Sequence, residues 1–587
     1  MSRFLLLFAA LATTTGLASA QTATQVCPAD QAVCVLEPGQ YINRVVNEDI
    51  VTNSDGTTSR KRADRIYQPQ QDAIYLFDGQ IINDGYHLRI IGATGSGKMP
   101  LVYATQTAGG STIGNFVRQQ NDVTLKNTAY SGVLDVSDDP AVNRQALELM
   151  PSQLVRVEAA GFRLVIDNVV MSNVRNEFIR AASALKALYM TNSVVVNGGY
   201  QGLTNLGNGK AIDIRDGSID SLVVRNTTFA NFTDRIIRHR QSVGALDVLI
   251  FDHNTVMNDF GYHGMFALGR VGKSARISNN LFYDNFVAGS DTSDTVRQSE
   301  FNESGELDAS GSEKMTWVLS EPNDVTAWDI RNNVYVVSPE VEAFYATYGN
   351  GQGDDGNAVN GPTNTNGDVG DNDIIGAGAP LTDHILSRID NDATAFVEAD
   401  FELVDRPAPM VSLGEWYRTE TGRTKGELDT FDPATDDMDR KPLTYFVDSG
   451  DFDASYPTSE SAYTAANGGC PVGDLNWFPN DYERCSALNV ANETDRGTVS
   501  GIAELFPVSP NPTRGSATLS YALAAPSEVE ITIVNMLGQT VATVVAPRTE
   551  TAGTHTVRWE GQLAAGVYVV RLQAEGTLVT RRMTVIR

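Results

Sequence analysis

The stretch "LVVRNTTFAN", residues 222–231, carries the pattern that decides the fold. An apolar run of strand length is followed by Arg225 and Asn226, and a second run ends at Asn231. β-Branched and aromatic residues favour strands, and a polar pair between two such runs favours a tight turn. The phrase therefore predicts two short strands that are joined by a bend at an asparagine.

This phrase recurs through the middle of the chain. The other copies are "LVIDNVVMSN", "LYMTNSVVVN", "IFDHNTVMN", "RISNNLFYDN" and "DIRNNVYVVS". The repeat period is about 26 residues, with one overlong interval, which is typical of one coil of a solenoid. Helical repeats need longer amphipathic segments, and the leucine spacing of leucine-rich repeats is absent. Aligned, the copies share a polar column at Asn168, Asn192, Asn226, Asn254, Asn280 and Asn333.

We predict an all-β fold: a right-handed parallel β-helix followed by a small antiparallel β-sandwich. In a β-helix each coil stacks on the last at about 4.8 Å, and apolar side chains fill the bore. Asparagines at the turns can bond to asparagines of the next coil and form a ladder. An antiparallel sandwich is the alternative for the repeat region.

The repeat phrases, from about residue 122 to residue 338, resemble the pectate-lyase-like β-helix superfamily of secreted carbohydrate-active proteins. This resemblance implies an extracellular polysaccharide as the partner. The later segment "DASYPTSESAYTAANGGCPVGDLNWFP" resembles the closing segment of cell-surface β-helix proteins. We expect Trp477 and Phe478 in this segment to cover the open end of the solenoid.

The N-terminus and the cysteines indicate export. Residues 1–20 have a basic residue, a short apolar run and small residues before Gln21, as in a secretory signal peptide. No later run is long enough for a membrane span. The cysteines form two local pairs without metal-binding spacing, which predicts two disulfides. The expected disulfides are Cys27 with Cys34 and Cys470 with Cys485.

Charge and compartment exclude nucleic acids and nucleotides as partners. The formal net charge is −28, which repels nucleic acid. The stretch "IGATGSGKMP", residues 91–100, has the glycine and lysine spacing of a phosphate-binding loop. However, Met99 replaces the required Ser or Thr, and a strand-like segment follows where a helix is needed. We interpret this stretch as a turn between two strands.

The C-terminal segment has a different sequence pattern from the rest of the chain. Short alternating strands from Phe506 onward predict a small antiparallel sandwich. The motifs Pro510-Asn511-Pro512, "VNMLGQTV" and Gly566-Val567-Tyr568 are similar to the type A sorting domain of the type IX secretion system. This resemblance implies contact with the secretion machinery and delivery to the medium or to the outer cell surface.

These features divide the chain into four parts. We predict a signal peptide at residues 1–20 and a pectate-lyase-like β-helix at residues 21–345. Residues 346–505 form a long loop, late coils and a disulfide-bonded cap, and residues 506–587 form the sorting domain.

The candidate site is the one cluster of basic residues in an acidic body. In "DRIIRHRQ", alternation along a strand places Arg238 and Arg240 on one face and His239 on the other. One coil later, "NDFGYHGMFALGR" supplies further polar groups. Surface ion pairs with nearby Asp residues are the alternative for the arginines. The catalytic candidates are Arg238, Arg240, Tyr262 and His263, and the candidate substrate-binding residues are Arg235, His239, Asp259 and Arg270.

Two functions fit these patterns. The first is an exported or cell-surface β-helix protein that binds or degrades a polysaccharide, with a lyase on uronate polymers as its enzymatic form. Lyases of this superfamily neutralise the uronate carboxylate with Ca²⁺ or a cationic side chain, so Ca²⁺ is the candidate cofactor. The lyase signature with its paired acidic calcium ligands is absent. The second function is a non-catalytic surface adhesin or glycan-binding protein.

Overall fold

The fold is seen in a computed structural model of the chain. The described residues are 23–132, 150–199, 207–215, 217–239, 245–268, 271–289, 317–320, 325–348, 380–390, 392–418, 453–491, 503–506, 508, 511, 513–523, 527–535, 540–551, 553–561, 563–574 and 577–586. The predicted signal peptide and the whole of the predicted long loop, Gly349 to Asp373, lie outside them.

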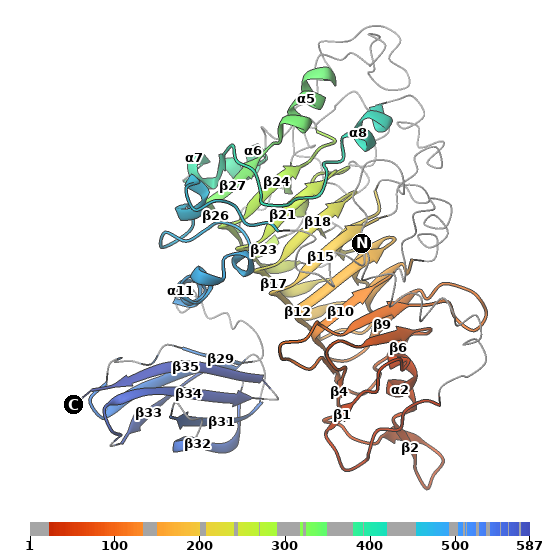
Figure 1. The fold of residues 1–587 in the computed structure, drawn as a ribbon, viewed down its shortest axis with the longest axis vertical. Helices are drawn as coiled ribbons and strands as arrows, with labels where there is room; N and C mark the ends of the chain where they lie inside the picture. The colour runs from red at the N-terminus through yellow and green to blue at the C-terminus, as the bar shows by residue number, and fades with distance from the viewer. Residues whose placement is uncertain are drawn as a thin grey trace.

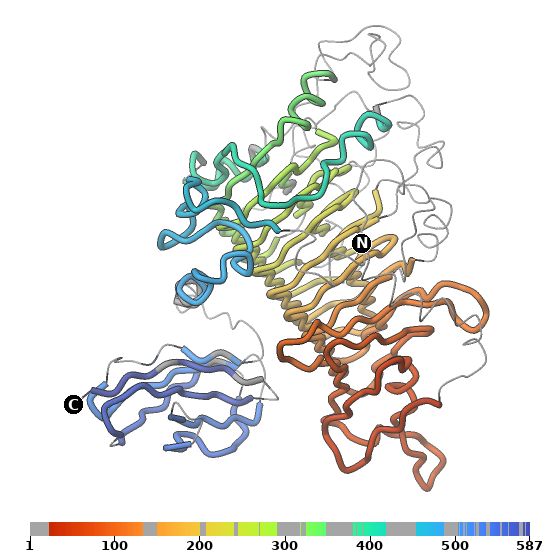
Figure 2. Tube along the Cα trace, viewed as in Figure 1, coloured from red at the N-terminus to blue at the C-terminus, as the bar shows by residue number. Residues whose placement is uncertain are grey.

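The predicted fold class is confirmed: parallel strands stack coil upon coil in the body, and the C-terminal segment is antiparallel (Figure 1). Each coil contributes up to three short strands, which form three faces. The tube in Figure 2 shows the coils following one another along the body in chain order. The repeated two-strand phrase therefore supplies two adjacent faces of each coil, and a third strand closes the coil.

The three faces are defined by strand pairing. Face 1 contains β1 (Val33–Val35), β4 (Ile66–Gln68), β7 (Leu88–Ile91), β10 (Val123–Ser131), β12 (Phe162–Val174), β14 (Leu185–Thr191), β17 (Ile219–Arg225), β20 (Leu246–Asp252), β23 (Val271–Ser278) and β26 (Ala327–Arg331). Face 2 contains β5 (Ile74–Phe77), β8 (Leu101–Ala104), the second halves of β10 and β12, β15 (Val194–Gly198), β18 (Thr228–Phe232), β21 (Thr255–Asp259), β24 (Leu281–Asn285), β27 (Asn333–Val336) and β28 (Phe396–Glu398). Face 3 contains β6 (Ile81–Ile82), β9 (Asn115–Gln119), β11 (Gln153–Val157), β13 (Glu177–Ala181), β16 (Lys210–Ile214), β19 (Ile237–His239), β22 (Phe266–Leu268) and β25 (Val318–Ser320).

Asparagines make both turns of the repeated phrase, because they tolerate positive φ. Between faces 1 and 2, the residues at positive φ are Asn127, Asn168, Asn192, Asn226, His253, Asn279 and Asn332. At the end of face 2 they are Asn173, Asn197, Asn231, Asn258 and Asp284. The predicted asparagine ladders are present, but the single predicted column is a mixture of two. By strand register Asn226 aligns with His253, so Asn254, Asn280 and Asn333 belong to the neighbouring column.

The ladder at the end of face 2 is buried and continuous over several coils. The Asn231 side chain donates to Asn197 Oδ1 at 3.0 Å and accepts from Asn258 Nδ2 at 2.6 Å. Asn197 in turn donates to Asn173 Oδ1 at 3.1 Å. Because a buried amide without partners is costly, each member stabilises the coil above and the coil below.

We expect Asn231→Ala to lower the free energy of unfolding by about 2 kcal/mol or more. The change leaves two amide partners unmatched and places a Cβ-bearing residue without a polar side chain at positive φ. Asn231→Gly removes the amide but accepts the backbone conformation, so it should cost about 1 kcal/mol less than alanine. Chemical denaturation of the three proteins measures both differences. Equal stability of wild type and Asn231→Ala would contradict a stabilising ladder.

The bore is apolar and is closed at both ends. At the N-terminal end, helix α2 (Ile42–Glu48) packs Ile42, Val45 and Val46 into the core. At the far end, α6 (Asp383–Leu386), α7 (Asp392–Ala395) and β28 supply the last core residues. The ring of Phe396 lies 5.4 Å from that of Phe282, centroid to centroid. These segments, rather than the predicted Trp477 and Phe478, cover the end of the solenoid.

Trp477 and Phe478 belong to a lateral cover on the outside of face 2. This cover contains η4 (Ser461–Thr464), η5 (Leu475–Trp477) and α11 (Pro479–Ala491), which lie beside the body in Figure 1. Its apolar residues pack on outward-facing residues of face 2 such as Met257 and Tyr283. The indole Nε1 of Trp477 donates to Thr228 Oγ1 at 2.8 Å. The predicted disulfide between Cys470 and Cys485 is present within the cover.

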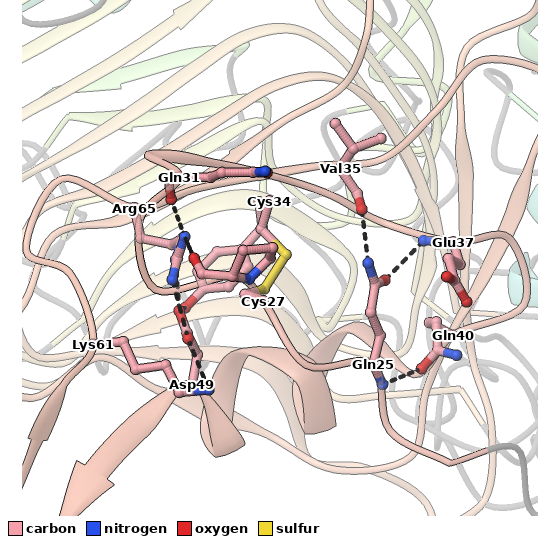
Figure 3. The surroundings of a disulfide bond; sticks show 12 residues. Gln25, Cys27, Gln31, Cys34, Val35, Glu37, Gln40, Asp49, Lys61 and Arg65 are labelled. Carbon is pink, nitrogen blue, oxygen red and sulfur yellow. Dashed lines mark hydrogen bonds and ion pairs between the residues drawn. A yellow bond between two sulfur atoms is a disulfide. The ribbon is translucent and has the colours of Figure 1, made fainter.

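The N-terminal disulfide is also as predicted. Cys27 and Cys34 are bonded, and Arg65 lies beside the loop that they close (Figure 3). Arg65 donates to the carbonyl oxygen of Pro28 at 3.0 Å and, through Nε, to Asp49 Oδ2 at 2.7 Å. Arg65 and Asp49 are both buried, so this pair ties the disulfide loop to the end of α2.

The stretch at residues 91–100 is a turn, as predicted. It connects β7 on face 1 to β8 on face 2. The backbone N–H of Lys98 donates to Asp72 Oδ1 at 2.9 Å, and Gln71 Nε2 donates to the carbonyl oxygen of Gly97 at 3.0 Å. The preceding coil therefore holds this turn in place.

The remaining elements lie at the margins of the body and in the C-terminal segment. The hairpin of β2 (Ile50–Thr52) and β3 (Thr58–Arg60) follows α2, while α5 (Pro339–Tyr348) and α8 (Val411–Arg418) pack on each other. The C-terminal segment has two antiparallel sheets around its own core, as predicted. One sheet contains β29 (Ala503–Leu505), β30 (Ser516–Leu523) and β33 (Gly553–Glu560), and the other contains β31 (Ser527–Val534), β32 (Thr540–Glu550), β34 (Gly566–Ala574) and β35 (Thr577–Val585).

Candidate functional site

Face 3 carries two rows of polar side chains that run across successive coils. Strand register aligns the first residues of β9, β11, β13 and β16, and it also aligns the residues three positions later. We call these the corner row and the arginine row. The corner row is Asn115, Gln153, Glu177 and Lys210, and the arginine row is Arg118, Arg156, Arg180, Asp213 and Arg238.

The corner row is a chain of hydrogen bonds. Asn115 Nδ2 donates to Gln153 Oε1 at 2.5 Å, and Gln153 Nε2 donates to Glu177 Oε2 at 2.7 Å. All three side chains are buried. Because each amide is held by the next coil, this row presents fixed polar groups.

The N-terminal part of face 3 forms an open groove of about 460 Å³. Residues of both rows line it, together with Glu158, which follows β11. Arg118 and Arg156 stand on neighbouring coils and give the groove its positive groups. A groove with polar walls that follows the axis of a solenoid suits an extended polymer.

A buried cluster of charged groups lies farther along the same face. Lys210 opens β16, Asp234 precedes β19, and His263 precedes β22, so all three stand at the corner where face 2 meets face 3. Lys210 Nζ lies 2.7 Å from Asp234 Oδ2, and His263 Nδ1 lies 2.9 Å from Asp234 Oδ1. The backbone N–H of His263 also donates to Asp234 Oδ1, at 3.1 Å. Asp234 therefore fixes the imidazole of His263.

The electrostatics favour an ionised Asp234. Burial alone would raise the pKa of Asp234. The charge of Lys210, the hydrogen bond from His263 and the charge of Arg235 outweigh burial and hold the pKa of this carboxyl well below its ordinary value. An ionised carboxylate accepts the proton of Nδ1, which leaves Nε2 as the ring atom of His263 that can accept a proton.

Two further carboxyl groups border the cluster. Asp213 is fully buried, and its Oδ1 lies 3.6 Å from Arg238 Nε. Burial, and then the charge of Asp213, raise the pKa of Glu177. The face thus holds positive and negative groups in close alternation. Because charges are seldom buried without a partner or a task, such a cluster is a candidate functional site.

Two of the predicted site residues reach the outside of face 3. Arg238 points outward from β19, as the alternation predicted, and 12% of its side chain is exposed. For His263 this fraction is 10%. Asp213 pairs with Arg238, and Asp234 pairs with His263. Arg238 and His263 therefore stand in neighbouring coils, Arg238 on β19 and His263 just before β22.

The other predicted residues have different positions. Arg235 is buried and donates through Nε to the carbonyl oxygen of His263 at 3.0 Å, so it supports the His263 loop. His239 lies in register with Ile214 and Leu268, which are core residues, and is itself buried. His239 therefore faces the bore and belongs to the core, which corrects the prediction that it binds substrate.

The predicted roles of Tyr262 in catalysis and of Asp259 in substrate binding are also corrected, because both residues are fully buried. Tyr262 packs in an apolar cluster against Tyr417 of α8, with ring centroids 5.6 Å apart. Asp259 accepts from the backbone N–H of Gly261 at 3.0 Å. Burial, and then the charge of Asp234, raise the pKa of Asp259 well above its ordinary value. Both residues shape the turn before His263. The two other candidates, Arg240 and Arg270, lie outside the described residues.

Several residues of the site were missed in the sequence. The sequence pattern does not identify Lys210 or Asp234, and it does not show that Asp213 pairs with Arg238 of the next coil. A signal for the arginine row is nonetheless present. The phrases "NFVRQ", "QLVRV" and "EFIRA" each place an arginine three residues after a polar residue, once per coil.

The donor set of this cluster does not fit Ca²⁺. Lys210, Arg235 and Arg238 stand beside its carboxylates, whereas a calcium ion needs oxygen ligands that are not already neutralised by cations. Across the described ranges, no group of three or more His, Cys, Asp or Glu residues could hold a metal ion.

The fold and the C-terminal segment define an exported β-helix protein. Residues 507–586 match the model of the secretion system C-terminal sorting domain. This match shows that the protein is delivered by the type IX machinery to the cell surface or the medium. Within the part of the chain that the structure describes, no helix is long and apolar enough to cross a membrane.

Other comparisons add little. No curated protein matches the chain. Among solved structures, the crystal structure of CopC from Methylosinus trichosporium OB3b is 21% identical and matches 14% of this chain and 92% of its own. Its TM-score is 0.12, so this likeness carries no argument.

Proposed function

We propose that the exported protein binds an extended polysaccharide along face 3 and cleaves it at the cluster around His263. The observation that carries this proposal is the Asp234–His263 pair, which stands at the corner of a face whose polar rows continue into an open groove. A polymer that follows the solenoid axis would meet one pair of polar side chains per coil, about every 4.8 Å.

The reaction class that suits these groups is elimination from a uronate polymer. A lyase removes the proton from the ring carbon that bears the uronate carboxylate, the neighbouring carbon–oxygen glycosidic bond breaks, and a carbon–carbon double bond forms. The leaving oxygen takes up a proton, which the protonated base can return to it. His263 Nε2 can act as the base, because Asp234 orients the ring and stabilises its protonated form. Arg238 is the predicted cation that is partly exposed on the outside of face 3, so it can neutralise the uronate carboxylate if that group displaces Asp213 from it.

The test is incubation of the purified protein with alginate, pectate and chondroitin, with absorbance of unsaturated chain ends as the readout. We expect His263→Ala and Arg238→Ala each to reduce the rate by about a hundredfold or more, a range typical of lost proton transfer or charge stabilisation. His239→Ala, a change within the bore, should alter stability without that loss of turnover at a temperature where it is folded. Wild-type rates in both active-site variants would exclude this site.

The alternative is a non-catalytic adhesin or glycan-binding protein. The small exposed fractions of His263 and Arg238 favour it, since a reacting sugar must reach both groups. No product from any of the three polymers, together with binding on a glycan array, would leave the adhesin as the function.

A further inference from the structure

The groove on face 3 contains one carboxylate that is held by two arginines. Glu158 Oε1 lies 2.8 Å from Arg118 Nε and 3.4 Å from Arg156 Nε. Gln120 Nε2 donates to the other oxygen, Oε2, at 3.3 Å. The exposed fractions are 37% for Arg118 and 34% for Arg156, but 17% for Glu158. The acid is therefore more enclosed than the two cations that hold it.

We propose that this groove is a subsite for the acidic group of a glycan, a carboxylate or a sulfate ester, and that Glu158 takes the place of that group in the free protein. The inference rests on the proposed function, which it deepens by naming a second place where an acidic sugar is held. It concerns a region separate from the His263 cluster, because Arg156 and Arg238 are three coils apart, about 14 Å along the axis.

The geometry suits an acidic group better than a neutral one. Arg118 and Arg156 stand on neighbouring strands, whose backbones are about 4.8 Å apart, and each guanidinium is a planar fork that matches an oxyanion. With one carboxylate between two arginines, these three groups carry a net positive charge within a chain of net charge −28. A local positive site in an acidic protein attracts an anion without binding polyanions over its whole surface.

The floor of the groove supports sugar recognition. The amide groups of Asn115 and Gln153 are fixed by their mutual hydrogen bond, and both residues line the groove. Fixed amides beside cations are the groups that recognise sugar hydroxyls and an acid on the same ring. In the free protein Glu158 pairs with both arginines, so another anion binds them only when it displaces the Glu158 carboxylate.

The test is calorimetric titration of the full-length protein with three oligosaccharides: oligogalacturonate, its methyl-esterified form and a chondroitin sulfate oligosaccharide. We expect Arg156→Gln to weaken binding of the acidic ligand about tenfold or more, the usual effect of losing a hydrogen bond to a charged group. Glu158→Gln should strengthen the same binding severalfold, because it removes the competing carboxylate. Binding of the esterified ligand should be weaker in the wild type and should not respond to either change.

The matched control is Asp220→Asn. Asp220 is exposed and forms an ion pair with Lys186 on face 1, so its loss changes the net charge as much as Glu158→Gln does. We expect no change in affinity. Stronger binding of oligogalacturonate than of the sulfated ligand identifies a uronate as the source of the acid, and the reverse order identifies a sulfate ester.

The outcomes separate this inference from the proposed function. If the wild type binds acidic ligands but Glu158→Gln leaves their affinity unchanged or lowers it, the inference is overturned and the proposed function stands. If the wild type binds the esterified ligand as tightly as the acidic one, the inference is also overturned and the proposed function stands. If the wild type binds none of these ligands and no glycan on an array, the proposed function and the inference both fail. Thermal unfolding of each variant shows that it is folded.

Discussion

Removal of residues 507–587 should abolish delivery of the protein to the cell surface and the medium. This segment matches the sorting domain almost to its last residue and has its own core, so its loss removes the export signal and leaves the β-helix intact. Fractionation of cells into periplasm, outer membrane and medium, with immunoblotting of the body, measures the effect. We expect the truncated protein to stay in the periplasm.

The converse experiment controls for instability of the truncated chain. Residues 507–587, fused to an unrelated protein that is exported to the periplasm, should carry that protein to the surface. If the truncated chain is still delivered and the fusion is not, this segment is not the export signal.

Lys210→Met should destabilise the body by about 3–5 kcal/mol, the usual cost of removing one partner of a buried ion pair. Lys210 and Asp234 are both almost completely buried, and their charged atoms are 2.7 Å apart. Methionine has a similar length but leaves the buried Asp234 carboxylate with less compensation of its charge. Chemical denaturation at neutral pH is the measurement.

Lys186→Met is the matched control, because Lys186 forms an exposed pair with Asp220 at 2.9 Å. We expect a cost below about 1 kcal/mol there. The double variant Lys210→Met/Asp234→Asn should recover part of the loss, since no unpaired carboxylate then remains. A loss at Lys210 no larger than that at Lys186 would contradict the structural role given to the pair.

The fold could be predicted because its pattern is local. Two apolar runs around an asparagine define two strands and a bend in every coil, and a repeat of about 26 residues leaves few architectures. The alignment of the coils could not be read from identical letters. In "IFDHNTVMN" the residue at positive φ is His253, and matching Asn254 to Asn226 shifted the register by one residue. The turn requires tolerance of positive φ, which histidine also has.

The candidate site was predicted only in part, because it is assembled across coils. Alternation along a strand was enough to put Arg238 and His239 on opposite faces, but it did not show that His239 is the one that faces the bore. It could not show that Asp234 of one coil meets both Lys210 and His263, since this depends on the register between coils. The position of the lateral cover could not be predicted either. Apolar residues such as Phe478 fit an open end and an outer face equally well.

The most direct test of glycan binding on face 3 is hydrogen–deuterium exchange of the full-length protein with and without a saturating acidic oligosaccharide. We predict protection in β9, β11, β13 and β16 and in the turn that holds His263, with no change in face 1 or in the C-terminal sandwich. Protection confined to face 1 or to the sandwich, or no protection despite saturation, would contradict a glycan site on face 3.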